Sequence, residues 1–77
     1  MHTNLSYAVE RRLRLIDFLL FHYGTLNRSA IIDYFGISMP QAAHDIRVYL
    51  AIAPNNMSYD KSAKTYKRGQ AFVRVWP

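Results

Sequence analysis

The chain contains no cysteine, and this absence removes several classes of protein at once. Without thiols it forms no disulfide, holds no metal through thiolates and has no cysteine nucleophile. Such a composition fits a reducing compartment better than secretion. We therefore expect a cytoplasmic protein.

Long apolar runs are missing as well. The longest run, FLLF at 18–21, is far too short to cross a bilayer, and the first 15 residues, MHTNLSYAVERRLRL, lack the apolar stretch of an export signal. Apolar material is instead spread along the chain, since 51% of the 77 residues are hydrophobic. This is enough for one modest core in a single small domain.

Acidic residues are few, and the basic excess is uneven. Residues 1–56 carry five arginines against four acids, whereas residues 57–77 carry five basic residues against Asp60 alone. A basic cluster in a chain of pI near 9.9 predicts a polyanionic partner. Nucleic acid is favoured over an anionic membrane because no strongly amphipathic basic helix accompanies the cluster. A solvated basic tail is the alternative.

Apolar spacing and capping residues predict three helices. The first, over about 6–23, carries one apolar stripe with Asp17 outside it and ends at Gly24. The second, over about 28–35, is expected to be capped by the side chain of Asn27. The third covers about 39–53 and tolerates Pro40 in its first turn. The stripe of the first helix consists of Val9, Leu13, Ile16, Leu20 and Tyr23.

The stretch YFGISMPQ separates the second helix from the third. Gly36 occupies a turn position, and Ile37 is expected to fill the core between the helices. Ser38 and Gln41 have the spacing of a capping box, which starts a new helix. The third helix then exposes its first turn and is expected to bury Ala42, Ile46, Tyr49, Leu50 and Ala53.

Beyond the helices, MSYD at 57–60 and TYKR at 65–68 predict a hairpin over about 57–68 with KSAK at its tip. The final stretch, QAFVRVWP, is expected either to add a third strand or to join a further domain. Helix, short extended segment, helix, tight turn, helix and basic hairpin is the order of a winged helix-turn-helix. We therefore predict a mainly α domain of this fold, with one small β-hairpin, over residues 1–77.

This fold predicts sequence-specific binding of duplex DNA, with the third helix in the major groove and the hairpin beside it. An ordinary three-helix bundle and a winged helix that binds only protein are the alternatives. The apolar surplus at Phe18, Leu19 and Phe21 motivates the protein-binding alternative. Candidate DNA contacts are Arg28 and Ser29, then Ser38, Met39, Pro40, Gln41, Ala43, His44 and Arg47, and in the hairpin Lys61, Ser62 and Lys64.

The candidates on the third helix and before it have distinct roles. Gln41 either holds an adenine edge through two hydrogen bonds or completes the capping box. His44 either meets a base or phosphate or is merely solvated. We expect Arg47 to bind a phosphate or guanine, and Arg28 to bind a phosphate with help from the helix dipole. For Ser38, capping is favoured over phosphate binding.

Charged residues also occur in the hairpin, on the third helix and on the first helix. Lys61, Ser62 and Lys64 either reach an adjacent minor groove or backbone or form a mobile charged loop. Asp45 is expected to pair with an arginine rather than to touch DNA. We expect Arg11, Arg12 and Arg14 to form a solvated helix face.

Catalytic and metal-binding patterns find little support. His2, His22 and His44 lack the spacing of metal ligands, and the five acids are scattered. There is no glycine-rich phosphate loop and no G-x-S-x-G motif. We therefore expect a non-enzyme with no cofactor.

A family resemblance adds to this reading. RRLRLIDFLL, followed by GTLNRSAIIDYFGISMPQAAHDI and APNNMSYDKSAKTY, resembles the N-terminal winged helix-turn-helix of bacterial WYL-domain transcription regulators, especially BrxR/CapW-like repressors associated with phage-defence loci. The resemblance covers about residues 9–72, and its most specific parts are NRS, GIS.PQA, DI and YD.SAK.Y in that order.

The resemblance implies a repressor of a phage-defence or related operon that works as a homodimer in its full-length context. Because one small module contacts too few bases to find a site in a genome, we expect two copies on a palindromic operator, and hence a nucleoid-associated protein. In such regulators a WYL domain and a dimerisation element follow. Both are absent from these 77 residues, which implies an excised domain or a stand-alone relative.

Overall fold

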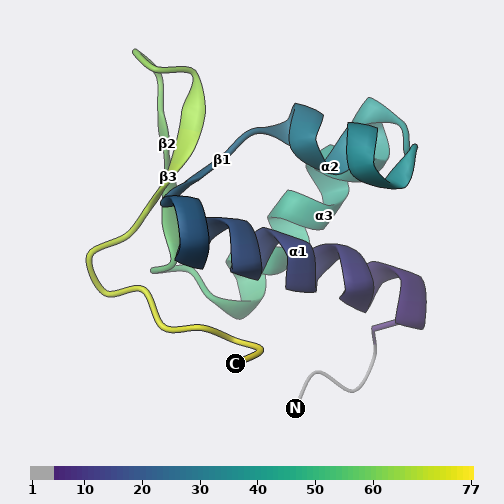
Figure 1. Cartoon of the computed structure of the whole chain (residues 1–77), viewed down its shortest axis with the longest axis horizontal. Coiled ribbons are helices and arrows are strands. Elements are labelled where there is room, and N and C mark those ends of the chain that lie inside the picture. Colours follow the sequence, from purple (N-terminus) through teal and green to yellow (C-terminus); the bar gives the residue numbers. More distant parts are fainter. Residues whose placement is uncertain (1–4) are drawn as a thin grey trace.

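The computed structural model, shown in Figure 1, describes residues 5–77 as three helices and a small sheet. The sheet has the strand order β1-β3-β2, and both pairings are antiparallel. This arrangement confirms the predicted winged helix-turn-helix. In chain order the elements are α1 (Tyr7–Tyr23), β1 (Thr25–Leu26), α2 (Arg28–Phe35), α3 (Met39–Ile52), β2 (Met57–Asp60) and β3 (Thr65–Arg68).

Side-chain caps define where two of the helices begin. The hydroxyl oxygen of Ser6 accepts a hydrogen bond of 3.2 Å from the amide of Val9, and Ser38 accepts one of the same length from the amide of Gln41. Each bond satisfies an N–H that has no partner within its helix. Asn27 holds the corresponding position before α2 but makes no side-chain cap bond, so that prediction is wrong.

Two glycines end the first two helices, as predicted. Gly24 and Gly36 have φ angles of 78° and 67°, in the left-handed region that suits glycine. The amide of Gly36 donates to the carbonyl of Ile32 at 2.8 Å, which closes α2 and frees the chain to turn. Ile37 then packs against the core from the turn, and α3 starts in a new direction.

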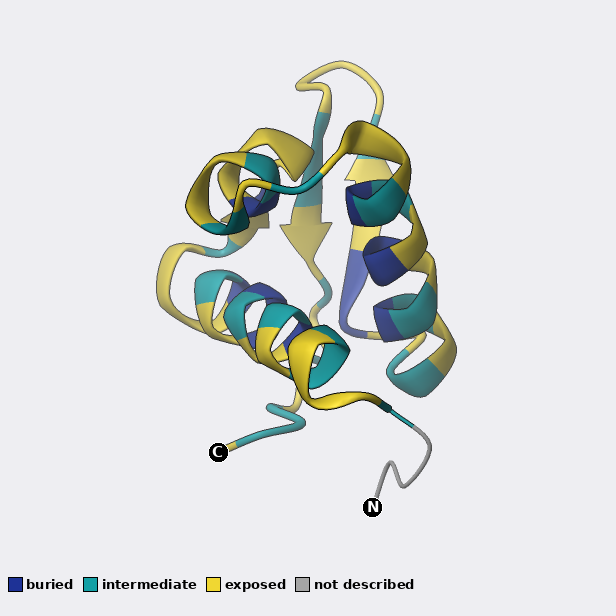
Figure 2. Ribbon diagram, turned by 90° about the vertical axis from the view of Figure 1, so that its right-hand side faces the viewer, coloured by how far each residue is buried: buried dark blue, intermediate teal, exposed yellow. Residues whose placement is uncertain are grey.

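The core lies between the inner faces of the helices and the sheet, as the dark blue segments in Figure 2 show. Predicted positions on α1 and α3 supply most of it, although Tyr23 is 67% exposed and Leu50 and Ala53 are only partly buried. The buried apolar residues are Leu13, Ile16, Leu20, Leu26, Ile31, Ala42, Ile46, Tyr49 and Met57.

Asp17 is completely buried, so its predicted place outside the core face is wrong. Its carboxylate accepts hydrogen bonds from the hydroxyl of Tyr49 at 2.6 Å and from the amides of Val75 and Trp76 at 3.0 Å. The C-terminal stretch therefore does not add a third strand, and its role as a junction with a further domain stays a prediction. It folds over α1 and covers Asp17, while β1 supplies the third strand of the sheet.

Two exposed segments lie on the same side of the molecule. In both Figure 1 and Figure 2, the tip of the β2–β3 hairpin and the first turn of α3 lie toward the top, and in Figure 1 the tip is at the left whereas α3 begins at the right. Within residues 5–77, no helix is both long enough and apolar enough to span a membrane.

Candidate nucleic-acid interface

Six of the twelve predicted DNA-contacting residues lie on α3, and four of these six are exposed to solvent. Met39 is 60% exposed, and Pro40, His44 and Arg47 are exposed as well. Gln41 and Ala43 are half-buried because they sit nearer to the packed face of the helix. The turn at Gly36 and the cap at Ser38 together determine the direction in which this surface points.

The start of α2 contributes a second, smaller surface. Arg28 and Ser29 are both exposed in its first turn. An arginine here is accompanied by the positive end of the helix dipole, so the two favour a bound anion together. The phosphate contact of Arg28 stays a prediction.

The tip of the hairpin is a hydrogen-bonded turn. Oδ1 of Asp60 accepts from the amides of Ser62 and Ala63 at 2.9 and 3.0 Å, and Oδ2 pairs with Nζ of Lys67 at 3.0 Å. These bonds, that from Ala63 first and that from Lys67 next, hold the pKa of Asp60 below its ordinary value. The turn leaves Lys61, Ser62 and Lys64 exposed at the tip.

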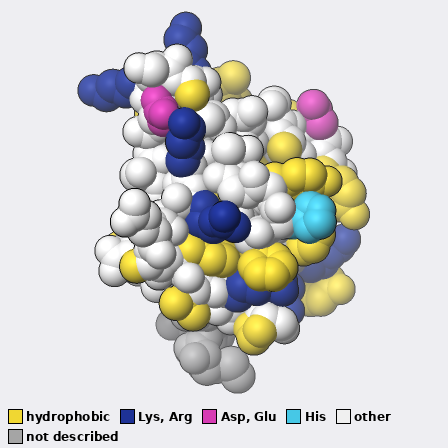
Figure 3. Space-filling view, turned by 60° about the vertical axis from the view of Figure 1, so that its left-hand side comes forward, with side chains coloured by type: hydrophobic (Ala, Val, Ile, Leu, Met, Phe, Trp, Pro, Cys, Tyr) yellow, Lys and Arg dark blue, Asp and Glu magenta, His cyan; other side chains and the backbone are white. Residues whose placement is uncertain are grey.

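The basic residues near the C-terminus are not equivalent. Lys67 pairs with Asp60, and Nη1 of Arg68 donates to the carbonyls of Leu20 and Phe21 at 3.3 and 2.9 Å, at the end of α1. Among the described residues neither Lys61 nor Lys64 has an ion pair. Basic side chains stand out at the hairpin end of the molecule in Figure 3. Within the C-terminal basic cluster, Lys61 and Lys64 at the tip are therefore available to a polyanion, and the exposed Arg28 and Arg47 add positive charge outside the tip.

The Gln41 side chain does something that neither sequence-based alternative included. Its Nε2 donates to Oδ1 of Asp45 at 3.0 Å, one turn further along α3. Only half of the capping box is present. The backbone N–H of Gln41 donates to the hydroxyl of Ser38, but the side-chain amide of Gln41 donates to Asp45 and does not reach back to Ser38. The side-chain NH₂ group of Gln41, a candidate base-contacting residue, is thus hydrogen-bonded within the protein.

Asp45 pairs with an arginine, as predicted, and the arginine is Arg12 on α1. Nε and Nη2 of Arg12 donate to the two carboxylate oxygens, the second at 3.2 Å. The side chain of Asp45 is 0% exposed and that of Arg12 only 11%. The prediction of a solvated face is therefore wrong for Arg12, although Arg11 and Arg14 are exposed.

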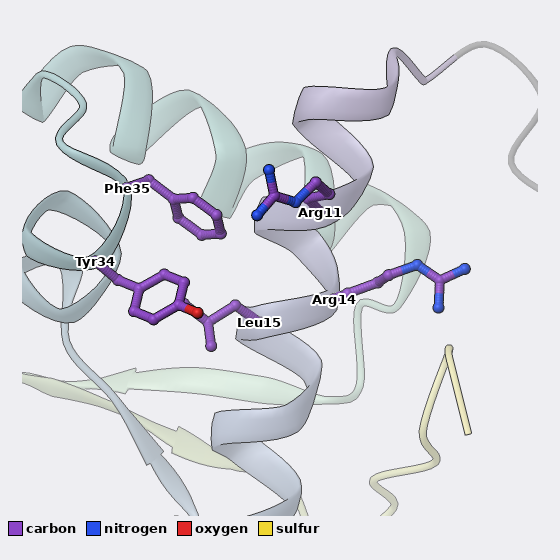
Figure 4. Close-up of a pocket in the computed structure, with 5 residues that line it drawn as sticks. All are labelled: Arg11, Arg14, Leu15, Tyr34 and Phe35. Carbon is purple, nitrogen blue, oxygen red and sulfur yellow. The ribbon is translucent and has the colours of Figure 1, made fainter.

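A shallow hollow of about 290 Å³ lies between α1 and α2, away from these residues (Figure 4). In Figure 4 the guanidinium of Arg11 points toward Phe35, whose ring centre is 5.7 Å away, whereas Arg14 points out of the hollow. None of the predicted DNA contacts lines it. Its lining residues are Arg11, Arg14, Leu15, Tyr34 and Phe35.

The apolar surplus on α1 is partly explained by contacts within the chain. Leu19 packs against the core, and the guanidinium of Arg74 lies 4.6 Å from the ring centre of Phe21. Phe18 stacks on His22 at 5.4 Å, yet Phe18 and Phe21 remain 43% and 47% exposed. Figure 3 shows hydrophobic side chains gathered beside a histidine on one face.

Metal-binding clusters of His, Asp and Glu do not occur among residues 5–77. His22 and His44 lie in this part of the chain, and His2 lies outside the described residues.

The sequence did not predict the burial of two carboxylates. Asp17 and Asp45 belong to different helices, and both lie one residue beside an apolar stripe position, next to Ile16 and Ile46. A charged residue at the edge of an apolar face is the signal that they leave in the sequence. Their partners on other elements are 32 and 33 positions away, namely Tyr49 for Asp17 and Arg12 for Asp45.

Three helices, of which α2 and α3 are joined by a tight turn, and a three-stranded sheet that ends in the β2–β3 hairpin define a winged helix-turn-helix domain. Comparison with known families agrees. Residues 8–76 match the family described as the BrxR transcriptional regulator winged helix-turn-helix domain, and the chain belongs to this family.

Curated relatives carry the name DNA-binding transcriptional repressor CapW. A protein of Pseudomonas aeruginosa is 46% identical over 71 residues, which are 92% of this chain and 24% of that protein. One of Escherichia coli (strain KTE188) is 45% identical over 91% of this chain and 23% of its own length. A third, from Stenotrophomonas maltophilia, is 36% identical over 83% and 21% respectively. The chain thus spans about a quarter of the length of the first two relatives.

Proposed function

We propose that the chain is the duplex-DNA-binding domain of a sequence-specific bacterial transcriptional repressor. The observation that carries this proposal is the placement of two surfaces on the same side of the molecule, the exposed first turn of α3 and the basic hairpin tip. An exposed helix start fits the width of a major groove, and a basic hairpin beside it meets the backbone or the adjacent groove. Membership of the BrxR family and the repressor relatives support the same function.

The proposed contacts divide by chemistry. Gln41, His44 and Arg47 lie along α3 and are assigned to base edges or to phosphates within the groove, with Met39, Pro40 and Ala43 forming the apolar surface around them. The others are assigned to the backbone, because they are exposed donors outside that helix face. They are Arg28, Ser29, Ser38, Lys61, Ser62 and Lys64.

The biological setting belongs to the same proposal. The relatives that are named repressors are about four times as long as this chain. We propose a homodimer on a palindromic operator of a phage-defence or related operon, in the cytoplasm and at the nucleoid. No catalytic step is part of the proposed role, since family membership indicates a regulator.

Binding-site selection from random DNA duplexes tests the proposal directly. Repeated selection with the purified chain should enrich one short motif, and a gel shift should show preference for that motif over scrambled DNA. Enrichment of no motif, together with equal affinity for scrambled DNA, would contradict sequence-specific binding.

A protein-interaction module is the second candidate. The observation that favours it is the half-exposed pair Phe18 and Phe21 on α1, outside the surface assigned to DNA. Substituting both by serine should leave DNA binding unchanged if the first proposal is right. The second candidate would be favoured if the wild-type chain binds no DNA and the double serine variant loses a protein partner that the wild type binds.

A further inference from the structure

A buried ion pair holds the side chain that the proposed function assigns to base reading. We propose that Arg12 and Asp45 are positioning residues that orient the Gln41 amide for DNA, an inference that rests on the proposed function. Neither residue touches the nucleic acid. Their role is to decide which end of the amide faces the groove.

The geometry connects α1 to the reading surface of α3 through one carboxylate. Asp45 accepts from Nε and Nη2 of Arg12 and from Nε2 of Gln41, the last at 3.0 Å. Asp45 is fully buried and Gln41 is half-buried one turn earlier on the same helix. The planar fork of Arg12 engages both oxygens of the carboxylate, so the carboxylate cannot rotate freely.

The chemistry of the carboxylate determines the orientation of the amide. A carboxylate only accepts hydrogen bonds, so the amide must turn its NH₂ end toward Asp45 and its oxygen Oε1 away. One N–H and Oε1 then remain for an external partner. These are the two groups with which a glutamine holds an adenine edge, so the pair presents the amide in a form that can read a base.

Stability alone is a weak reason for this ion pair. A buried ion pair gains little net stability, because the cost of removing both charges from water offsets their attraction. The second arginine–acid pair of α1 shows the contrast, since Arg14 and Glu10 meet at 2.8 Å on an exposed face. The side chain next to this pair is Trp76, whose ring centre lies 5.6 Å from the Arg14 guanidinium and which is not assigned to DNA. Holding a reader in one rotamer lowers the ordering cost of binding, and this benefit accounts for the buried arrangement.

The test compares two double substitutions that leave the net charge unchanged. R12M/D45L replaces the buried pair by apolar side chains of similar size, which often preserves folding. E10L/R14M removes the exposed pair from the same helix and serves as the control. Each protein, and Gln41→Ala, is measured on the selected duplex and on the duplex changed at the base pair where Gln41→Ala loses discrimination.

We expect Gln41→Ala to lose about tenfold of discrimination at that base pair. R12M/D45L should lose most of the same factor, and adding Gln41→Ala to it should cost little more, because both act through one contact. E10L/R14M should keep the full preference. If Gln41→Ala loses discrimination while R12M/D45L keeps it, the positioning role is wrong and the proposed function stands. If Gln41→Ala keeps its preference on DNA that the chain binds selectively, the assignment of Gln41 as a reader fails instead.

A second measurement uses no DNA and does not depend on whether the double variant folds. In the free wild-type protein, ¹⁵N relaxation of the Gln41 side-chain NH₂ should show an amide as rigid as the backbone, and Asp45→Asn should make it more mobile. An amide that already moves freely in the wild type would overturn the proposal, whatever the DNA measurements show.

Discussion

The hydroxyl of Tyr49 on α3 donates a hydrogen bond of 2.6 Å to Oδ1 of Asp17 on α1, and both side chains are completely buried. Nδ2 of Asn56 donates to the same hydroxyl at 2.9 Å and to the carbonyl of Val73 at 2.8 Å. One network therefore joins two helices to the C-terminal stretch. Its polar groups satisfy each other where water has no access, so loss of a single member leaves an unpaired buried group.

Tyr49→Phe should lower the free energy of unfolding by roughly 1–3 kcal/mol, because it removes one hydroxyl and leaves Asp17 with one donor fewer in the core. Urea denaturation followed by circular dichroism measures this loss. Tyr34→Phe is the matched control, since Tyr34 is 71% exposed and the change should be within about 0.5 kcal/mol. Equal stability of the two variants would contradict the importance of the buried network.

The same tyrosine predicts a loss of stability in alkali. Burial first, and then the hydrogen bond to Asp17, raise the pKa of Tyr49 above its ordinary value of 10.0. A raised folded-state pKa gives a contribution that is complete below about pH 10 and is lost as the pH rises further. The wild type should therefore lose stability relative to Tyr49→Phe between pH 10 and 12, measured by denaturation at each pH. A constant difference across that range would contradict the raised pKa.

The lowered pKa of Asp60 leads us to expect a loss of structure at the hairpin tip in acid. Its pKa is lowered by the hydrogen bond from the amide of Ala63 and then by Lys67, so its contribution to the hairpin tip is present above the ordinary value of 3.8. The contribution is lost as the pH falls through the lowered pKa. Amide proton shifts of Ser62 and Ala63, followed by NMR, should stay constant down to about pH 4 and change below it. In Asp60→Asn this acid transition should disappear.

Reading and anchoring residues should separate by their salt dependence. Lys61→Ala and Lys64→Ala should each weaken binding to selected and scrambled DNA alike, and should each lower the slope of log affinity against log salt by about 0.9. Gln41→Ala should cost roughly 1–3 kcal/mol on the selected site and little on scrambled DNA, because a base contact discriminates and a phosphate contact does not. Fluorescence anisotropy over a range of salt concentrations measures both. Circular dichroism should show every variant folded.

Two copies should occupy a palindromic operator. One domain with three short contact segments contacts too few base pairs to specify a unique site in a genome. The selected motif should therefore consist of two inverted half-sites about one helical turn apart. Sedimentation of the chain with an intact palindrome should show a 2:1 complex at saturating protein. A tight 1:1 complex that excludes a second copy would count against this arrangement.

Local signals in the sequence were sufficient for the elements of this fold. The cap at Ser38, the turn at Gly36 and the two strands of the hairpin lie where the pattern predicts them, and so does the centre of the α1 stripe, Leu13, Ile16 and Leu20. Each depends on residues within about five positions, whose interactions form in any chain that adopts the element. The exposure of the first turn of α3 follows from the same periodicity, and so does the surface that carries the candidate site.

Only the tertiary structure decided how the charged residues are used. Arg12 pairs with Asp45 across 33 positions, Tyr49 bonds to Asp17 across 32, and the amide of Trp76 reaches Asp17 across 59. Periodicity assigns an isolated charge to solvent, because burial is costly until a partner is present. Folding brings the partner, and then a buried carboxylate is stable. The orientation of Gln41 depends on Asp45 in this way, so the sequence by itself determined the helix that meets solvent, and packing decided how its reading side chain is held.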